Sequence, residues 1–233
     1  MALAPNTSGG VTGAGAGPFT VSLSPSGTDR ALFAGITYYH PTATLTSVTF
    51  NGVAMTAVPS GSYDPGGDLH IRWFYLIAPD TGAHDFSYSF SGGGVFDSGV
   101  ALTVWTDCDQ TTPYGTPVGA AATSTTPSVD VTSAADEYVV DTLIIFHSGT
   151  LTVGASQTEI ANAICPNAHV KHAGSYEVGA ATTTMSWANS ASQFWATMGV
   201  PVKPAGVAPT GQPSTKRLAG VPWMTPTRFS GVW

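Results

Sequence analysis

Glycine and proline interrupt this sequence so often that no segment is suited to a long helix. The chain of 233 residues contains 27 glycines and 17 prolines, and no window places apolar residues at the 3.6-residue helical period. Apolar and polar residues instead alternate over short runs, as in residues 19–23 and 45–50, and turn residues separate these runs. Such a pattern is typical of β-strands joined by turns. We therefore predict an all-β chain.

The strand-like runs follow one another without intervening helices, which favours antiparallel pairing. They cover residues 19–23, 31–39, 45–50, 53–58, 69–77, 85–90, 99–106, 128–131, 137–146, 182–187 and 194–202. Asn51-Gly52 separates two of them and predicts a hairpin, because both residues tolerate the positive φ angles of a type I′ turn. Residues 150–175 are weaker and suggest irregular structure. We predict an antiparallel two-sheet β-sandwich of jelly-roll-like topology.

Three regions are expected along the chain. Residues 1–17 are rich in Gly, Ala, Ser and Thr and predict a flexible N-terminal arm. Residues 18–204 hold the strand-like runs and are long enough to bury a core of their own as one β-sandwich domain. Residues 205–233 begin as a Pro/Gly linker, which favours an extended chain. They continue as a basic, aromatic C-terminal arm.

The charges are few and unevenly distributed. Only 9% of the residues are charged and the formal net charge is −7. Residues 1–202 contain all 14 acidic residues and three bases, whereas residues 203–233 contain four bases and no acid. Four bases are sparse for neutralising phosphates, and the acidic body would repel nucleic acid. An acidic protein surface, such as the body of a sister subunit, is the better partner for the tail.

The C-terminal arm contains the residues that we predict to make contacts with another chain. An exposed aromatic side chain on a segment too short to form a core normally enters a pocket on a partner. Folding back onto its own domain is the alternative. The predicted interaction residues are Lys216, Arg217, Trp223, Met224, Arg228, Phe229 and Trp233.

Cys108 and Cys165 are the only cysteines. Two thiols cannot complete a structural zinc site, which needs four ligands, and they could form one bridge at most. We expect both to be free and buried, since free cysteine behaves as a small apolar residue.

Residues 1–17 contain no basic residue and no apolar run, so the sequence predicts no signal peptide. No run approaches the roughly 20 apolar residues that span a bilayer, so no membrane association is predicted.

Motifs for catalysis and cofactor binding are absent from the sequence. It contains no G-x-S-x-G nucleophile elbow, no H-E-x-x-H zinc helix and no P-loop. The alternating glycines of residues 13–17 precede no predicted helix and do not form a dinucleotide fingerprint. His169 and His172 are the only closely spaced histidines, and on a strand a spacing of three places them on opposite faces. We predict no enzyme activity, no metal and no cofactor.

The acidic residues lie mostly at predicted turns. Asp64 and Asp68 flank one turn and Asp107 and Asp109 bracket Cys108. Such loops can hold calcium, but neither has the spacing of a known calcium loop, and turn chemistry is the favoured interpretation. Asp141 is the exception because it lies inside an apolar strand, where a side chain that points outwards would explain it. Two carboxylates across a groove could hydrolyse glycosides, but the sequence does not place such a pair.

Most aromatic residues of the body fall within apolar strands, and we expect them to pack in the core. They are Trp73, Tyr75, Trp105, Trp187 and Trp195. Tyr38 and Tyr39 are adjacent and therefore face opposite sides of a sheet. One of these two tyrosines is a candidate for a sugar-stacking platform.

Four segments of the body together resemble a known β-sandwich module. They are LTSVTFNGVAMTAV (45–58), RWFYLIAPDTGAHDFSYSFSG (72–92), the run from SGVALTVWTDCDQTTPYG to EYVVDTLIIF (98–146) and WATMGVPVKP (195–204). The module recurs in bacterial surface proteins and in structural proteins of tailed bacteriophages, and the resemblance covers residues 19–204. The tail KRLAGVPWMTPTRFSGVW (216–233) is similar to the C-terminal ends of some phage virion proteins. Cys108 departs from the pattern, which has a small or apolar residue there.

The resemblance implies a virion structural protein without catalytic residues. A capsid decoration (cement) protein is the leading hypothesis, with a head or tail fibre subunit as a variant of it. The resemblance also implies a homo-oligomer, a trimer above all, that binds the major capsid protein or another virion protein and is located in the virion. A carbohydrate-binding or host-adhesion module that recognises a surface glycan is the alternative. An enzyme such as a depolymerase ranks third.

Overall fold

The computed structural model describes residues 2–92 and 94–206, and every regular element in them is a β-strand. The all-β prediction is confirmed. The strands are β1 (Ala4–Gly15), β2 (Phe19–Leu23), β3 (Ala31–Tyr39), β4 (Thr44–Phe50), β5 (Val53–Ala54), β6 (Thr56–Gly66), β7 (Leu69–Ile77), β8 (His84–Ser91), β9 (Val95–Thr106), β10 (Val118–Ser124), β11 (Ser128–Val131), β12 (Tyr138–Phe146), β13 (Leu151–Val153), β14 (Thr158–Ile164), β15 (Val170–Val178), β16 (Thr183–Asn189) and β17 (Gln193–Val202).

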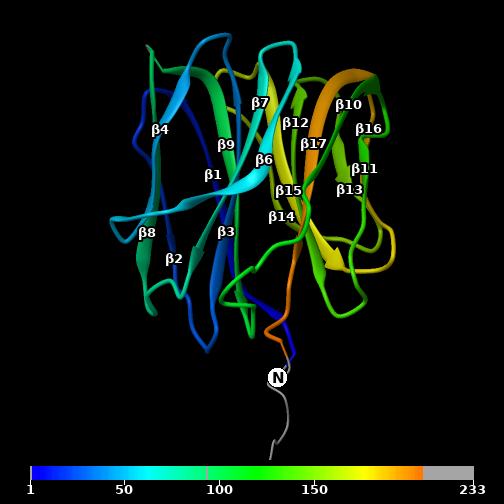
Figure 1. The fold of residues 1–233 in the computed structure, drawn as a ribbon. Helices are drawn as coiled ribbons and strands as arrows, with labels where there is room; N and C mark the ends of the chain where they lie inside the picture. The colour runs from blue at the N-terminus through cyan, green and yellow to red at the C-terminus, as the bar shows by residue number, and fades with distance from the viewer. Residues whose placement is uncertain (1, 93, 207–233) are drawn as a thin grey trace, which may run out of the picture.

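The strands form four antiparallel sheets stacked as layers, rather than the two that we expected (Figure 1). The two inner sheets have the strand orders β1-β9-β3-β7-β6 and β10-β17-β12-β15-β14. The outer sheet β2-β8-β4-β5 covers the first inner sheet, and β11-β16-β13 covers the second. The antiparallel sandwich is therefore confirmed, but the chain builds two sandwiches back to back. A chain of this length divides its core between them.

The two sandwiches have the same topology. Replacing β1, β9, β3, β7 and β6 by β10, β17, β12, β15 and β14 converts the first inner sheet into the second, and β2-β8-β4 corresponds in the same way to β11-β16-β13. Only β5 has no counterpart. It pairs with β4 in the outer sheet, and the chain then crosses into β6 at the edge of the inner sheet. This order of strands is that of a jelly roll, so the molecule is a jelly roll repeated once.

The strand registers relate the two halves residue by residue. Ala31 pairs with Trp105 and Ile77, and Tyr138 pairs with Val202 and Val178 at the corresponding place. From there β3 and β12 run in step, so Tyr39 corresponds to Phe146. Contacts between the halves also occur twice: Trp73 donates from Nε1 to the carbonyl of Met198 at 3.3 Å, and their counterparts Gly174 and Ala101 are also in close contact. Such reciprocity is the mark of a two-fold axis.

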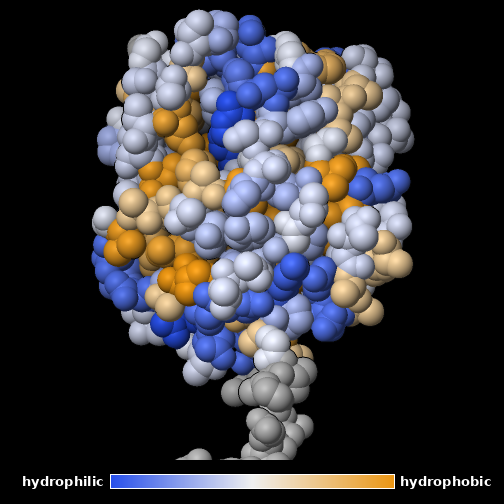
Figure 2. All heavy atoms as spheres, in the orientation of Figure 1, coloured by the Kyte–Doolittle hydropathy of each residue, from blue (hydrophilic) through white to orange (hydrophobic). Residues whose placement is uncertain are grey.

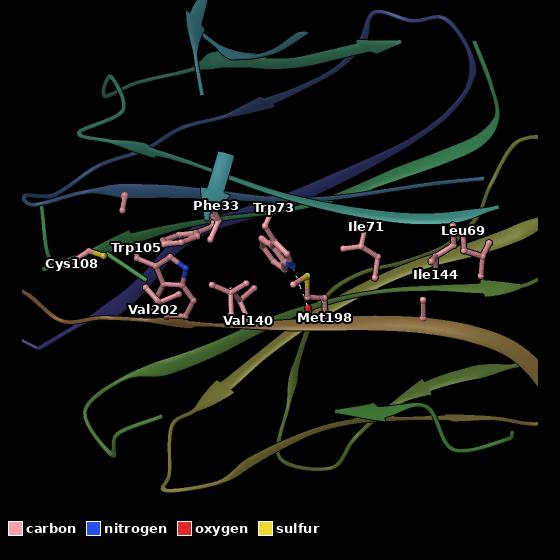
Figure 3. Close-up of a cluster of buried hydrophobic side chains, with 14 of the residues drawn as sticks. Phe33, Leu69, Ile71, Trp73, Trp105, Cys108, Val140, Ile144, Met198 and Val202 are labelled. Carbon is pink, nitrogen blue, oxygen red and sulfur yellow. Dashed lines mark hydrogen bonds between the residues drawn. The ribbon is translucent and has the colours of Figure 1, made fainter. Parts of the chain in front are cut away.

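The largest core cluster lies between the two inner sheets (Figure 3). Trp73, Trp105 and Phe33 enter it from the first half and meet Val140 and Met198 from the second. A separate cluster lies inside the first sandwich, around Leu32, Ile36, Phe50, Phe86 and Tyr88. Two smaller clusters lie inside the second sandwich. Alternate residues of β3 thus face different cores, which is why that strand reads as almost entirely apolar.

Two expectations about local structure are wrong. The N-terminal segment is not a loose arm over residues 4–15, because β1 pairs with β9 along its length and Leu3 is buried in the central core. Glycine explains the difference: a Cβ on Gly10 would lie 2.7 Å from the Val100 carbonyl oxygen, so small residues permit a close approach that a strand-propensity argument overlooks. Residues 150–175 are not irregular either, since they contain β13, β14 and the start of β15.

Other expectations are confirmed. Asn51 and Gly52 have φ angles of 48° and 74°, and Phe50 pairs with Val53 across them, as a type I′ hairpin requires. Cys108 and Cys165 are free and buried. The four strand tryptophans, Trp73, Trp105, Trp187 and Trp195, are buried, while Tyr75 is half-buried against the central core. The described part of the chain contains no helix that could span a membrane.

Candidate functional site

The interaction residues predicted from the sequence lie outside the described residues. They are Lys216, Arg217, Trp223, Met224, Arg228, Phe229 and Trp233. The structure does describe the place from which that segment departs. The amide of Ala205 donates to the carbonyl of Asp107 at 2.7 Å, and Pro204 forms a bridge with Cys108. The body therefore holds the chain up to Ala205.

Both ends of the described chain meet at one end of the sandwich, which we call the terminal end. Leu3, Tyr138 and Gly206 line a single cavity of about 450 Å³ there, together with Asp136 and Glu137. In Figure 1 the N-terminus and the last described residues lie together at the lower end of the view. Two carboxylates thus line a cavity at the point where the basic segment begins. This arrangement suits a cationic partner.

The opposite end of the sandwich carries a cluster of rings. β12 starts at Tyr138 in the terminal cavity and ends at Phe146, and β3 ends beside it at Tyr39. The ring centroids of these counterparts are 5.5 Å apart in an edge-to-face arrangement. Phe96 lies 5.3 Å from Tyr39, and three further rings join the group. We call this group the loop-end cluster; it consists of Tyr39, His40, Phe96, Phe146, His169 and Phe194.

A buried carboxylate fixes one side of the loop-end cluster. Asp97 is fully buried, and its oxygens accept the amides of Asn167 at 2.8 Å and His169 at 2.9 Å. The Nδ1 atom of His169 lies 3.0 Å from the same carboxylate. The His169 side chain is 49% exposed, so Nδ1 is engaged while the rest of the ring faces outwards. A hydrogen-bonded carboxylate that orients an imidazole in this way leaves the other nitrogen for a ligand.

A polar cluster adjoins these rings and is built on Asp64. Arg72 donates to both carboxylate oxygens at 2.7 and 3.0 Å, and Nδ1 of His70 lies 2.6 Å from one of them. His70 also donates from Nε2 to the carbonyl of His40, which belongs to the loop-end cluster, and stacks on Tyr38 at 4.6 Å. Partial burial raises the pKa of Asp64, but the hydrogen bonds from Arg72 and His70 outweigh it and hold the pKa below its usual value. Asp64 is therefore a charged partner of Arg72.

Tyr38 and Tyr39 face opposite sides of the sheet, as predicted, and join different clusters. Tyr38 is buried in the first sandwich and carries Arg72 over its ring at 5.7 Å. Burial raises the pKa of its hydroxyl. Tyr39 instead packs against the central core and the loop-end rings. The tyrosine next to exposed aromatic surface is therefore Tyr39.

The aspartates of the loops that we considered for calcium make other interactions within the protein. Asp109 Oδ1 accepts the amides of Thr111 at 2.7 Å and Thr112 at 3.1 Å, and these bonds lower its pKa. Asp68 lies at a turn with φ of 58°, and Asp64 is paired with Arg72. These are the roles of turn and ion-pair carboxylates. Among the described residues, no three His, Cys, Asp or Glu side chains gather as a metal site requires.

Asp141 points inwards, so the expectation of an outward side chain is wrong. It is fully buried in the second sandwich and accepts hydrogen bonds from the Ser175 amide and hydroxyl, both at 2.7 Å, and from Trp187 Nε1 at 2.8 Å. Burial raises the pKa of this carboxyl to about 6, against the lowering effect of those bonds. The counterpart of Asp141 in the first half is Ala34. A closed hydrogen-bonded position of this kind is structural.

His169 and His172 lie on opposite sides, as the spacing predicted. His172 is fully buried between the halves, with Nδ1 2.8 Å from the hydroxyl oxygen of Thr37. Burial lowers its pKa to about 4, so the ring is neutral at ordinary pH. His169, by contrast, lies half-exposed in the loop-end cluster. The two histidines therefore do not share a ligand.

Most basic side chains of the described residues are engaged by the protein itself. Arg30 donates to the carbonyl of Pro79 at 2.9 Å, Arg72 binds Asp64, and the ammonium group of Lys171 donates to the carbonyl of Gly149. The fourth base, Lys203, lies beside the terminal end. The loop end therefore presents rings and neutral polar groups rather than uncompensated cations within the described part of the chain.

Comparison with known proteins adds no relative. No protein-family model, no curated protein and no solved structure matches the chain. Sequence reasoning named Tyr39 and weighed His169 only as half of a metal pair, but it missed Phe96, Asp97 and Asn167, which the fold brings together. The available signal was Phe96, an aromatic residue two positions after the glycine run of residues 92–94.

Proposed function

We propose that this chain is a structural protein of a tailed-bacteriophage virion, and more specifically a capsid decoration protein. The observation that carries the proposal is the polarity of the molecule: the basic, aromatic C-terminal segment begins at the terminal end, where the N-terminus also lies. The doubled jelly roll then stands away from its point of attachment. Jelly rolls occur in viral capsid proteins and in lectins, and the sequence resemblance favours the virion.

Charge supports attachment through the terminal end. The segment after Gly206 carries Lys216, Arg217 and Arg228 and no acid. Asp136 and Glu137 line the terminal cavity of every copy. A cationic segment from one subunit is therefore complementary to the terminal end of the next, and opposite charges steer such an encounter. We propose a homo-oligomer on this basis, with a trimer as the expected form because the resemblance implies it.

The aromatic residues of the same segment supply the affinity in this proposal. Trp223, Phe229 and Trp233 are large apolar side chains, and burying each contributes up to a few kcal/mol. Repeated through an oligomer, three such anchors hold a protein on a particle by multivalency. The major capsid protein or another virion protein is the partner, and no catalytic step is part of this function.

The experiment is to locate and count the protein in purified particles. Quantitative mass spectrometry of the virions is expected to find it in a copy number that matches a repeated site of the shell, and gold-labelled antibody is expected to bind the head. Its absence from particles would refute the virion proposal. A copy number of a few per particle, with label on the tail, would replace decoration by a fibre role.

A carbohydrate-binding or host-adhesion module is the second candidate. The loop-end cluster favours it, because an exposed phenylalanine and two imidazoles lie together at the end that faces away from the terminal cavity. The two functions are compatible in one protein, since they use opposite ends. If the protein binds a saccharide but is absent from the particles, adhesion is the candidate function that remains.

A further inference from the structure

Phe96 is exposed in a way that the fold does not require. Four large apolar side chains among the described residues are exposed, and Phe96, at 42%, is the only aromatic one. The others, Val53, Ile164 and Val178, are aliphatic. The face seen in Figure 2 has separate apolar patches among polar residues rather than one broad apolar surface. A single exposed ring is too small for a stable protein interface, which buries on the order of 800 Å² on each partner.

The ring of Phe96 is held in place by its neighbours. The His40 and Tyr39 rings lie 4.6 and 5.3 Å from it, and the His169 ring lies 6.0 Å away. The Asn167 side chain donates to the Phe96 carbonyl at 2.6 Å. Phe96 is therefore a fixed platform flanked by two imidazoles. A site with its rings already ordered loses little conformational entropy when it binds a ligand.

Asp97 provides a second layer beneath this platform. Its buried carboxylate binds the amides of Asn167 and His169 and the Nδ1 atom of His169. It thereby fixes the loop that carries both residues beside the strand that carries Phe96. A buried charge is costly unless such hydrogen bonds satisfy it. The arrangement orients an imidazole and an amide next to an exposed aromatic face, which is how a polar ligand is positioned.

The chemistry of the loop-end cluster selects the class of ligand. An aromatic face accommodates the apolar C–H face of a pyranose ring, while imidazole nitrogens exchange hydrogen bonds with hydroxyls. An anionic ligand would need cations, but Arg72 is paired with Asp64 and Lys171 is bonded to a carbonyl. Single-stranded nucleic acid would stack on rings too, yet it needs a positively charged groove along its backbone. A neutral saccharide matches all of these groups.

We propose that the loop-end cluster is a binding site for a neutral saccharide, which stacks on Phe96 and hydrogen-bonds to His169 and His40. This inference deepens the adhesion candidate and is independent of virion attachment, because it uses the end opposite the terminal cavity. The virion proposal fails if the protein is absent from particles. The saccharide proposal fails if no saccharide binds or if the Phe96→Ala variant binds equally well, whether or not the protein is found in particles.

The test is a binding assay on the full-length protein. Calorimetry and a glycan array are to be run with neutral oligosaccharides of glucose, galactose, mannose and N-acetylglucosamine, and with neutral polysaccharide from host cell envelopes. We expect at least one of these probes to bind. Phe96→Ala is expected to weaken that binding up to about tenfold, because an aromatic stacking contact contributes up to roughly that factor. His169→Gln is expected to weaken it as well.

Val53→Ala is the matched control, since Val53 is an exposed apolar residue of the Asn51-Gly52 hairpin, outside both the loop-end cluster and the terminal cavity. It should bind the saccharide as the unmodified protein does, and both it and the Phe96→Ala variant should melt at nearly the same temperature as the unmodified protein. No binding to any probe, or equal binding by the Phe96→Ala variant, would overturn the proposal. Loss of binding to a virion or host protein in Phe96→Ala, without saccharide binding, would make the platform a protein contact and would overturn it too.

Discussion

Gly35 and Thr142 occupy corresponding positions in the two jelly rolls and lie against each other across the central interface. The Thr142 hydroxyl donates to the Gly35 carbonyl at 3.4 Å, and a Cβ on Gly35 would lie 2.9 Å from the Thr142 Cβ. Corresponding residues meet only where a two-fold axis passes, so this pair marks the axis that relates the halves. The two inner sheets approach closely here because one of the two residues has no side chain.

Gly35→Ala therefore tests how tightly the halves pack. The added methyl would also lie 2.8 Å from two ring carbons of Trp73. Overpacking a well-ordered core costs about 1–3 kcal/mol, and we expect a loss of that size in chemical denaturation. Gly206→Ala is the control, because nothing lies within 4 Å of its Cβ position, and it should change stability by less than about 0.5 kcal/mol. Equal stability of the two variants would contradict the packing described.

Asp141 gives the protein a pH-dependent stability of a defined sign. Burial raises its pKa from 3.8 to about 6, so the folded chain binds this proton more tightly than the unfolded chain does. The contribution to stability is present at low pH and is lost as pH rises through that interval. Its size is about 3 kcal/mol, at about 1.4 kcal/mol for each pKa unit.

Asp141→Asn removes this titration. As pH rises from 4 to 7, the free energy of unfolding of the variant, relative to that of the unmodified protein, should increase by about 3 kcal/mol. Urea denaturation at each pH measures this difference. Asp109→Asn is a control of opposite sign, because the amides of Thr111 and Thr112 lower the pKa of Asp109. The stabilisation that Asp109 provides is lost as pH falls. A stability difference for Asp141→Asn that does not vary with pH would show that the carboxyl titrates normally.

The two cysteines should be unreactive in the native protein. Burial raises the pKa of both Cys108 and Cys165 to about 12, and only the thiolate reacts with disulfide reagents. At pH 8 we expect no fast labelling of the folded chain and two labelled thiols per chain after denaturation without reductant. Fast labelling of the folded protein would contradict their burial, and no labelling after denaturation would reveal a bridge.

Deleting residues 1–15 should destabilise the fold, because β1 covers one edge of β9 and Leu3 reaches the central core. The shortened protein would expose the unpaired edge of an apolar strand, which promotes aggregation. We expect a lower melting temperature and poorer solubility by calorimetry and light scattering. An unchanged melting temperature would instead support the flexible N-terminal arm that the composition predicted.

The sequence predicted those features that local chemistry determines. Alternation and turn residues located most strands, and Asn51-Gly52 specified its hairpin because positive φ is a local requirement. The inward side chain of Asp141 could not be predicted, since its partners Ser175 and Trp187 lie far along the chain. The glycine-rich strand β1 was missed because its stability comes from pairing with β9 rather than from its own propensity.

The internal repeat was missed for a related reason. Ala31–Tyr39 and Tyr138–Phe146 perform the same role with unlike residues, and only their registers reveal the correspondence. The loop-end cluster brings together β3, β9, β12 and the loop before β15. Contacts of this kind depend on topology, which the alternation of residues does not specify.

The central claim is attachment through the C-terminal segment, and rebinding to particles tests it most directly. Labelled full-length protein and a variant that lacks residues 207–233 are to be sedimented with particles that have been stripped of the protein. The deletion keeps Ala205 and its bond to Asp107, so both proteins should melt at nearly the same temperature. We predict that the full-length protein sediments to a saturating copy number and the deletion variant stays in the supernatant. Equal binding by a folded deletion variant would contradict the claim.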